Sequence, residues 1–261
     1  MELEVIGCAT TAPTGVDVCS SYLVRHDGVT LLLDCGPGAV HRLQERRSLI
    51  DLTAIIITHM HSDHCLDLVP AAGRLLIQRR IEGAEGKTRL LAPPGGREVL
   101  ANLMGVFSQF GTGIMHRSMD HAFAIEEYQQ PGTVEIGPMR VRFSEPLKHE
   151  APCSAIRVEV EGRSVCYSGD TAPCDAITRH ARGADLFLCE ATYPRRPADR
   201  PYLHLSPEEA GEIAAAAGVG NLVLTHFARS DAQWKQAMRE RAQQSFGSPV
   251  GTASRGLVVQ V

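Results

Sequence analysis

Positive charge is not in excess in this sequence. Its 261 residues include 26 lysines and arginines against 30 aspartates and glutamates, which gives a formal net charge of −4 at pH 7. A protein that holds a long nucleic acid neutralises many phosphates with a broad basic surface. This composition supplies no such surface, so it favours a small molecule or a short nucleotide as the binding partner.

Long apolar runs and paired cysteines are also missing. No apolar stretch reaches the roughly 20 residues that a membrane-spanning helix needs. The chain begins Met1-Glu2-Leu3-Glu4, with acidic residues where a secretory signal would carry lysine or arginine. The eight cysteines include no Cys-x-x-Cys pair, which argues against a disulfide framework or a cysteine zinc knuckle. We therefore expect a cytoplasmic protein without a membrane partner, in which the cysteines are small buried side chains.

The hydrophobic residues are numerous enough for a substantial core. They make up 44% of the chain, against 21% charged residues, and we predict a single domain over residues 1–261. The order strands, helix, strands, helix occurs twice along the chain. Each half can form a sheet with helices on one face. Packing the two sheets together then gives an α/β fold of the α+β type, a four-layer αββα sandwich.

Alternating and turn-bounded patterns give the expected elements. The predicted strands cover residues 3–7, 21–25, 30–34, 54–58, 89–92, 133–136, 139–143, 155–160, 164–168, 185–189 and 222–225. The predicted helices cover residues 38–47, 65–80, 97–103, 172–182 and 206–217. Between them, Gly105–Asp120 has three glycines and no clear period, so we predict a mobile loop whose role is open.

Four residues that can bind metal lie close together in Thr58-His59-Met60-His61-Ser62-Asp63-His64. His59 and His61 follow an apolar run at 54–57, and two residues of an extended chain that are two positions apart project to the same side. Asp63 and His64 come where the chain turns toward the next helix. Imidazole nitrogens and carboxylate oxygens are common ligands of first-row metals. Because one ion cannot easily use all four, we expect His59 and His61 to face one ion and Asp63 and His64 another.

Three later strand ends carry further ligand types, namely His149, Asp170 and His226. His149 would complete the first site and His226 the second. Asp170 follows Gly169, which lets the backbone approach closely, and could bridge the two ions. Each of these residues alone is as readily a cap or a turn residue, but together with the first motif they predict two zinc ions per chain. Manganese and iron are the alternative metals.

These motifs resemble the metallo-β-lactamase superfamily. The resemblance rests on Thr-His-x-His-x-Asp-His at 58–64, His149, Ser-Gly-Asp-Thr at 168–171 and Thr-His at 225–226, and Asp34-Cys35-Gly36 is similar to an early Asp-x-Gly strand end. It covers almost the whole chain and implies the αββα fold. Within the superfamily, the chain is most similar to the tRNA 3′-processing ribonucleases (ribonuclease Z) and their relatives, the arylsulfatases and class II cyclic-nucleotide phosphodiesterases. Asp170 stands where the β-lactamases use a cysteine, and His204-Leu205-Ser206 is similar to that branch's His-x-Ser/Thr helix start.

The resemblance implies a role for His204, because the matching histidine of that branch is implicated in proton transfer during phosphodiester cleavage. We expect a hydroxide that bridges the two ions to attack phosphorus in line. Asp63 would hold or accept a proton from the nucleophile. His204 would protonate the departing oxygen, a task that suits an imidazole with an ordinary pKa of about 6.5. The alternative interpretation is that His204 merely precedes a helix capped by Ser206.

The sequence also departs from the processing ribonucleases. They carry a long arm that grips tRNA between the positions matching His149 and Asp170, and here only 21 positions separate the two. A tight hairpin around Glu161-Gly162-Arg163 fills that interval. We therefore expect a phosphodiesterase for a cyclic nucleotide or a short nucleic acid, and we do not expect tRNA to bind through the usual arm.

Several alternatives stay open at this point. The activated water could open another ester, such as a sulfate ester, a lactone or a thioester, or the chain could be a tRNA 3′-processing endoribonuclease. A mononuclear iron oxygenase on the same fold is an alternative of a different class. The family resemblance also suggests a homodimer. Ala9–Gly15 could bring backbone N–H groups near the metals or be a plain loop, and His116, Arg117 and His121 could contact substrate or be solvated.

Overall fold

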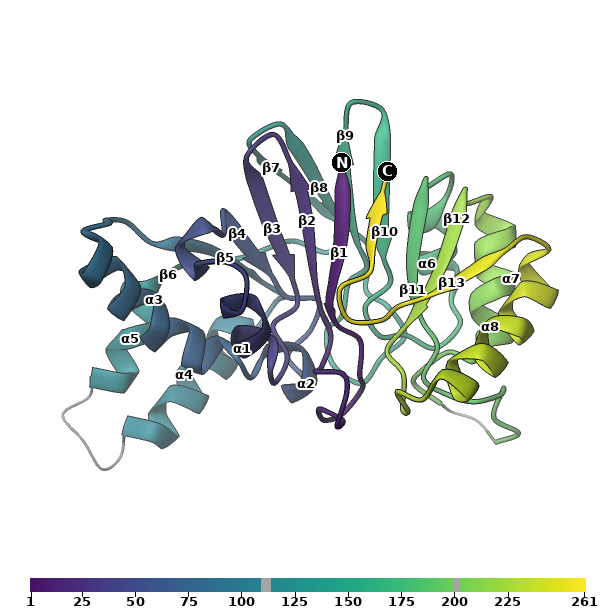
Figure 1. Cartoon of the computed structure of the whole chain (residues 1–261), viewed down its shortest axis with the longest axis horizontal. Helices are drawn as coiled ribbons and strands as arrows, with labels where there is room; N and C mark the ends of the chain where they lie inside the picture. Colours follow the sequence, from purple (N-terminus) through teal and green to yellow (C-terminus); the bar gives the residue numbers. More distant parts are fainter. Residues whose placement is uncertain (109–113, 200–201) are drawn as a thin grey trace.

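A computed structural model describes residues 1–108, 114–199 and 202–261 of the chain. These residues form two seven-stranded mixed sheets packed face to face (Figure 1). The first sheet has the order β14 (Val258–Gln260), β1 (Glu2–Gly7), β2 (Ser21–His26), β3 (Val29–Leu33), β4 (Ala54–Ile56), β5 (Thr88–Ala92) and β6 (Phe123–Glu127). The second has the order β13 (Val250–Thr252), β12 (Asn221–Thr225), β11 (Leu186–Glu190), β10 (Arg163–Tyr167), β9 (Ile156–Val160), β8 (Met139–Phe143) and β7 (Gly132–Ile136).

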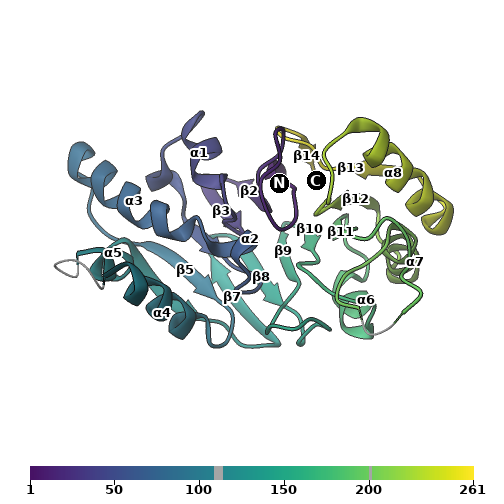
Figure 2. The same ribbon diagram turned by 90° about the horizontal axis from the view of Figure 1, so that it is seen from below.

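Helices cover the outer faces of the sheet pair, as Figures 1 and 2 show. One group consists of α1 (Ala39–Gln44), the 3-10 turn η1 (Leu49–Asp51), α2 (Ser62–Cys65), α3 (Leu68–Glu82), α4 (Gly96–Ser108) and α5 (Ile114–Ala122). The other consists of α6 (Asp175–Ala181), α7 (Pro207–Ala217) and α8 (Ala232–Phe246). The predicted four-layer αββα architecture is therefore confirmed. In the described ranges, none of these helices is long and apolar enough to cross a membrane.

Strand β4, which lies between β3 and β5 in the first sheet, is buried on both faces. Ala54 and Ile56 of β4 point into the core between the sheets, whereas Ile55 points to the core under the helices. A strand buried on both faces has a continuous apolar sequence, which is why β4 could be predicted. All the predicted strands exist within a few residues, whereas β6, β13, β14 and α8 were not predicted. All eight cysteines are free thiols, and seven of them are buried.

The prediction of a mobile loop over Gly105–Asp120 is wrong for the residues that the structure describes. α4 extends to Ser108 and α5 begins at Ile114, while residues 109–113 lie outside the described residues. Leu100 and Met104 of α4 and Met119 of α5 are buried in the core under the first sheet. An apolar stripe packed in this way stabilises a helix more than the propensity of one glycine weakens it.

The contact between α7 and α8 depends on a glycine. A Cβ atom added to Gly211 would lie 2.4 Å from the carbonyl oxygen of Ala242 on α8. Gly211→Ala should therefore destabilise the protein by about 1–3 kcal/mol, although alanine favours helices. Gly73→Ala in α3 is the matched control, since its Cβ would meet nothing within 4 Å; it should stabilise by about 0.4–1 kcal/mol. Urea unfolding of both variants checks the pair, and equal stabilities would contradict the close packing.

Candidate metal centre

The predicted ligands meet at one edge of the sheet pair. In each sheet, four of the seven strands run parallel, namely β3 to β6 and β10 to β13, so their carboxyl ends share an edge. His59 and His61 follow β4, Asp170 follows β10 and His226 follows β12. The short helix α2, which lies at the lower edge in Figure 1, carries Asp63 and His64. The fold thus brings together residues that are up to 167 positions apart in the sequence.

Two groups of ligand atoms form, as the sequence predicted. In the first, His61 Nδ1 lies 3.1 Å from His149 Nε2, and His59 completes the group. In the second, His226 Nε2 lies 3.2 Å from His64 Nε2 and 3.3 Å from Asp63 Oδ2. All these residues are buried except His61 and His149, which are partly exposed.

Asp170 lies between the two groups. Its Oδ2 atom is 3.7 Å from His59 Nε2, 3.3 Å from His64 Nε2 and 3.5 Å from His226 Nε2. Gly169 precedes it with a positive φ of 58°, and a Cβ at that glycine would lie 3.1 Å from Cys153 Sγ. The glycine therefore permits both the backbone turn and the close packing that place the carboxylate between the two groups.

The outward-facing nitrogen of each ligand histidine has an acceptor. His64 Nδ1 donates to Asp34 Oδ2 at 2.7 Å, and His149 Nδ1 donates to the Leu203 carbonyl at 3.2 Å. The remaining pairs are His59 Nδ1 with Thr58 Oγ1 at 3.0 Å, His226 Nδ1 with Thr192 Oγ1 at 2.7 Å, and His61 Nε2 with Glu150 Oε1 at 3.0 Å. In a neutral ring the outer nitrogen carries the proton and the inner nitrogen presents a lone pair to the centre. A cation bound there would displace the second proton that the raised pKa of His64 favours.

The centre fits divalent cations. Two ligand atoms bound at about 2.1 Å to one tetrahedral ion lie about 3.4 Å apart, which is close to the spacings found here. His59 Nε2 and Asp170 Oδ1 are buried and lack a hydrogen-bond partner among the described residues. Buried polar atoms without a partner are costly. Cations bound between these groups would satisfy those atoms and separate the facing lone pairs.

The charges in the centre reinforce one another. Burial alone would raise the pKa of Asp170, but the imidazoles of His226 and His64 outweigh it and hold the pKa well below the usual range. Burial lowers the pKa of His64, whereas Asp170 and Asp34 raise it above the usual value. Asp170 is therefore a carboxylate anion at neutral pH, as a bridging ligand must be.

His204 lies beside this centre with its own carboxylate partner. Its Nδ1 donates to Glu190 Oε1 at 3.1 Å and lies 3.8 Å from Asp170 Oδ2. Burial lowers the pKa of His204, but the carboxylates of Glu190 and Asp170 overcome this and raise the pKa to about 9. The ring is 20% exposed. Since Nδ1 is occupied, Nε2 is the nitrogen available to a bound molecule.

Glu190 was not predicted from the sequence. Its side chain is fully buried and also accepts from the Thr171 N–H at 2.7 Å and from Thr192 Oγ1 at 2.7 Å. Glu190 is the last residue of β11, and three of the proposed ligands likewise lie just after strand ends. That position at a strand end was the sequence signal that could have identified Glu190. Of the two alternatives left open for Ala9–Gly15, the structure favours the backbone N–H donor, since the Thr11 N–H donates to Asp63 Oδ2 at 2.7 Å.

The remaining candidates lie elsewhere or are not described. His121 is exposed on α5, and the side chains of His116 and Arg117 lie outside the described part of the structure. Asp34, noted in the sequence only for its motif, proves to be a fully buried acceptor for His64 Nδ1, Thr58 and Tyr167.

The contact between Glu150 and His61 should contribute to metal binding by the first group, His59, His61 and His149. Its carboxylate holds His61 Nε2 and so directs Nδ1 inward, although Glu150 itself is largely exposed. Glu150→Gln should weaken the zinc affinity of the first group about 10-fold, the lower end for outer carboxylate partners. Competition with a chromogenic chelator measures this affinity. Glu145→Gln, which removes an exposed carboxylate paired with Arg179, is the control; equal affinities in the two variants would show that Glu150 does not position His61.

Comparison with known proteins identifies the family. A family model described as the beta-lactamase superfamily domain matches residues 30–227 of the chain. The chain belongs to the metallo-β-lactamase superfamily. Membership in the metallo-β-lactamase superfamily makes it a hydrolase with a fold that binds divalent metal ions, in agreement with the clustered histidines and carboxylates.

Relatives of this superfamily member cover most of its length. The ribonuclease Z of Mycolicibacterium paratuberculosis is 33% identical over 266 residues, which cover 93% of each chain. An uncharacterized protein of Mycobacterium tuberculosis is 32% identical over 231 residues, 87% of this chain and 81% of that protein. The metallo-β-lactamase fold protein YhfI of Bacillus subtilis has a TM-score of 0.85 at 24% identity and covers 99% of this chain and 98% of its own.

Proposed function

We propose that the chain is one domain over residues 1–261 that acts as a dinuclear zinc phosphodiesterase on a cyclic nucleotide or a short nucleic acid. The observation that carries the proposal is Asp170 between two ligand groups, with the His204–Glu190 pair beside it. Two bound zinc ions would supply a water of lowered pKa and neutralise the charge of a phosphodiester. His-rich sites of this kind suit zinc, with manganese or iron as alternatives.

The proton-transfer roles go to Asp63 and His204. Asp63 is anchored by the Thr11 N–H and lies next to His226, so its second oxygen can accept a proton from the attacking water. His204 is held by Glu190 in an orientation that leaves Nε2 free to donate to the departing oxygen. Asp63 lies on α2 and His204 precedes α7, so the two groups reach the metal centre from different elements.

Two features favour a small substrate. The strands β9 and β10, which lie between His149 and Asp170, are joined by the tight turn Glu161-Gly162, with no room for a protruding arm. The net charge of −4 also offers little to a long polyanion. A homodimer and a cytoplasmic location remain predictions from the sequence.

A panel of chromogenic substrates tests the proposed chemistry. The zinc-loaded protein should hydrolyse a bis-aryl phosphodiester at least about 100-fold faster than an aryl sulfate, a lactone or a thioester, because the centre is matched to phosphoryl charge. Activity restricted to the carboxylic esters or to the sulfate would refute the phosphodiesterase. Protein stripped by a chelator is the control for adventitious hydrolysis.

A second candidate is a tRNA 3′-processing endoribonuclease. The ribonuclease Z relative at 33% identity covers 93% of this chain and is itself little longer, which favours it. Cleavage of a tRNA precursor at its 3′ end, with no turnover of cyclic nucleotides, would support this candidate against the first.

A further inference from the structure

A second cluster of metal-ligand types lies at the opposite edge of the molecule. The turn between β2 and β3 and the turn between β9 and β10 both lie at the upper edge in Figure 1, away from α2. The first turn follows His26 and contains Asp27, and the second contains Glu161. The two hairpins belong to different sheets, yet these three side chains converge.

The geometry around His26 is that of an incomplete site. His26 Nε2 lies 3.6 Å from Asp27 Oδ2 and 3.6 Å from Glu161 Oε2, and the ligand atoms of all three residues lie within 4.8 Å of one another. The His26 side chain is only 13% exposed. Its Nε2 is buried and has no hydrogen-bond partner among the described residues. A buried nitrogen without a partner is rare enough to need an explanation.

The two distances from His26 Nε2 fit a shared ion better than direct hydrogen bonds. An N–H···O bond spans about 2.7–3.2 Å, so neither carboxylate accepts from Nε2 at 3.6 Å. Two atoms bound at about 2.1 Å to one tetrahedral ion are about 3.4 Å apart. The imidazole and the two carboxylates are thus too far apart for direct hydrogen bonds and close to the spacing of ligands around a common cation.

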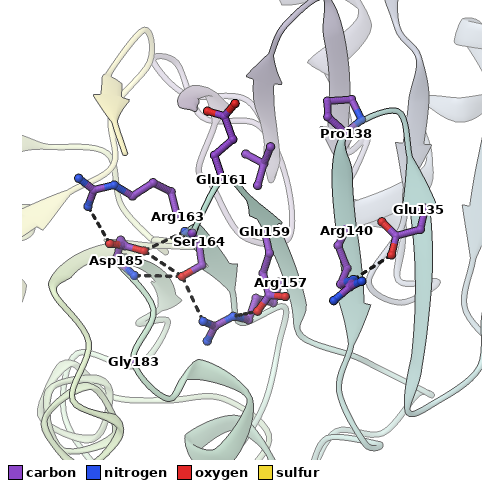
Figure 3. Close-up of a pocket in the computed structure, with 12 residues that line it drawn as sticks. Glu135, Pro138, Arg140, Arg157, Glu159, Glu161, Arg163, Ser164, Gly183 and Asp185 are labelled. Carbon is purple, nitrogen blue, oxygen red and sulfur yellow. Dashed lines mark hydrogen bonds and ion pairs between the residues drawn. The ribbon is translucent and has the colours of Figure 1, made fainter.

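The charge balance at this cluster also favours a cation. Figure 3 shows the neighbouring groove, in which the other acidic groups are paired with arginines: Glu135 with Arg140, Glu159 with Arg157, and Asp185 with Arg163. The Glu161 carboxylate points away from those pairs. Within the described ranges, no lysine or arginine forms an ion pair with Asp27 or Glu161. Two negative charges therefore face a single imidazole.

We propose that His26, Asp27 and Glu161 form a third cation site, which takes a divalent ion of the zinc class. Two carboxylates neutralise the charge of such an ion, and waters would complete its coordination. The imidazole selects against calcium and magnesium, which take oxygen ligands. Because Asp27 and Glu161 come from different sheets, a bound ion ties the two hairpin turns together and stabilises the folded chain. This site is separate from the catalytic proposal.

Zinc stoichiometry tests this site. After equilibrium dialysis of the full chain at micromolar free zinc, the wild type should hold one ion more than Glu161→Gln and His26→Gln. Glu85→Gln, which removes an exposed carboxylate elsewhere, is the matched control and should keep the wild-type number. Zinc should also raise the melting temperature of the wild type more than that of Glu161→Gln.

A difference of one bound ion between the wild type and Glu161→Gln tests the third site, whatever number of ions the catalytic centre holds. Equal stoichiometry in the wild type and Glu161→Gln would overturn the third site. Loss of the extra ion in Glu85→Gln as well, or its uptake only at millimolar zinc, would show adventitious binding and also overturn it. Two ions instead of three in the wild type, with one in Glu161→Gln, would support the third site while counting against a dinuclear catalytic centre.

Discussion

Replacing Asp170 by asparagine should remove at least one of the two metal ions and lower phosphodiester hydrolysis by about 10³-fold or more. Asparagine keeps the shape of the side chain but removes the negative charge that faces His59, His64 and His226. Loss of the carboxylate that lies between the groups would weaken binding of both ions, and activity that depends on two metals would fall with it. Metal content after gel filtration and kcat at saturating substrate measure the two effects.

The control for this variant is Asp175→Asn on α6. Asp175 is 97% exposed and lies in a weak ion pair with Arg179, so the same change of charge should leave both metal content and kcat as they are. Full retention of two ions in Asp170→Asn would show that Asp170 does not bridge them.

Replacing His204 by alanine should lower kcat by about 10²–10⁴-fold and leave the metal content unchanged. The reason is that His204 supplies a proton to the departing oxygen in the proposed mechanism and is not counted among the seven proposed ligands. Glu190→Gln should cause a smaller loss, because glutamine can still accept from His204 Nδ1 but no longer stabilises the protonated ring. The double variant should lose little more than His204→Ala, since the two residues act as a unit.

His121→Ala is the control for this series, because His121 is exposed on α5 and has no place in the proposed chemistry. Metal analysis separates the interpretations of His204. Loss of an ion in His204→Ala would make it a ligand, and unchanged kcat would make it the residue ahead of a capped helix that the sequence also allowed. Ser206 does cap α7, accepting from the Glu209 N–H at 3.3 Å. This cap is compatible with a catalytic His204 and with a His204 that only precedes the helix.

The clustering of the proposed ligands was predictable because three of them follow strand ends. His59, Asp170 and His226 each come directly after an apolar run, and the carboxyl ends of parallel strands share an edge. The division into two groups also followed from local spacing, since alternation directs His59 and His61 to one side before the turn into α2. These features are local in the sequence, and the architecture only had to bring them together.

The residues that hold the proposed ligands in place were harder to predict from the sequence. Asp34 and Glu190 are carboxylates buried at strand ends, and the sequence does not reveal whether such a side chain turns toward a metal or toward a histidine. The partner of Asp34, His64, lies 30 positions away, and only the packing of β3 beside β4 brings them together. The end of α4 beyond the predicted helix at 97–103, and all of α5, were missed for another reason. Glycines in this segment weaken the local signal, while burial of Met104 and Met119 stabilises the helices in the folded chain.

The most direct test of the account is a side-by-side assay of the metal-quantified protein on a 3′,5′-cyclic nucleotide and on a tRNA precursor. The account predicts hydrolysis of the cyclic nucleotide with a kcat/KM at least about 100-fold above that for the precursor, a difference of about 2.7 kcal/mol in transition-state binding. It also predicts that this activity disappears when a chelator removes the ions from the catalytic centre. Cleavage of the precursor without hydrolysis of the cyclic nucleotide, by protein with a full complement of metal, would contradict it.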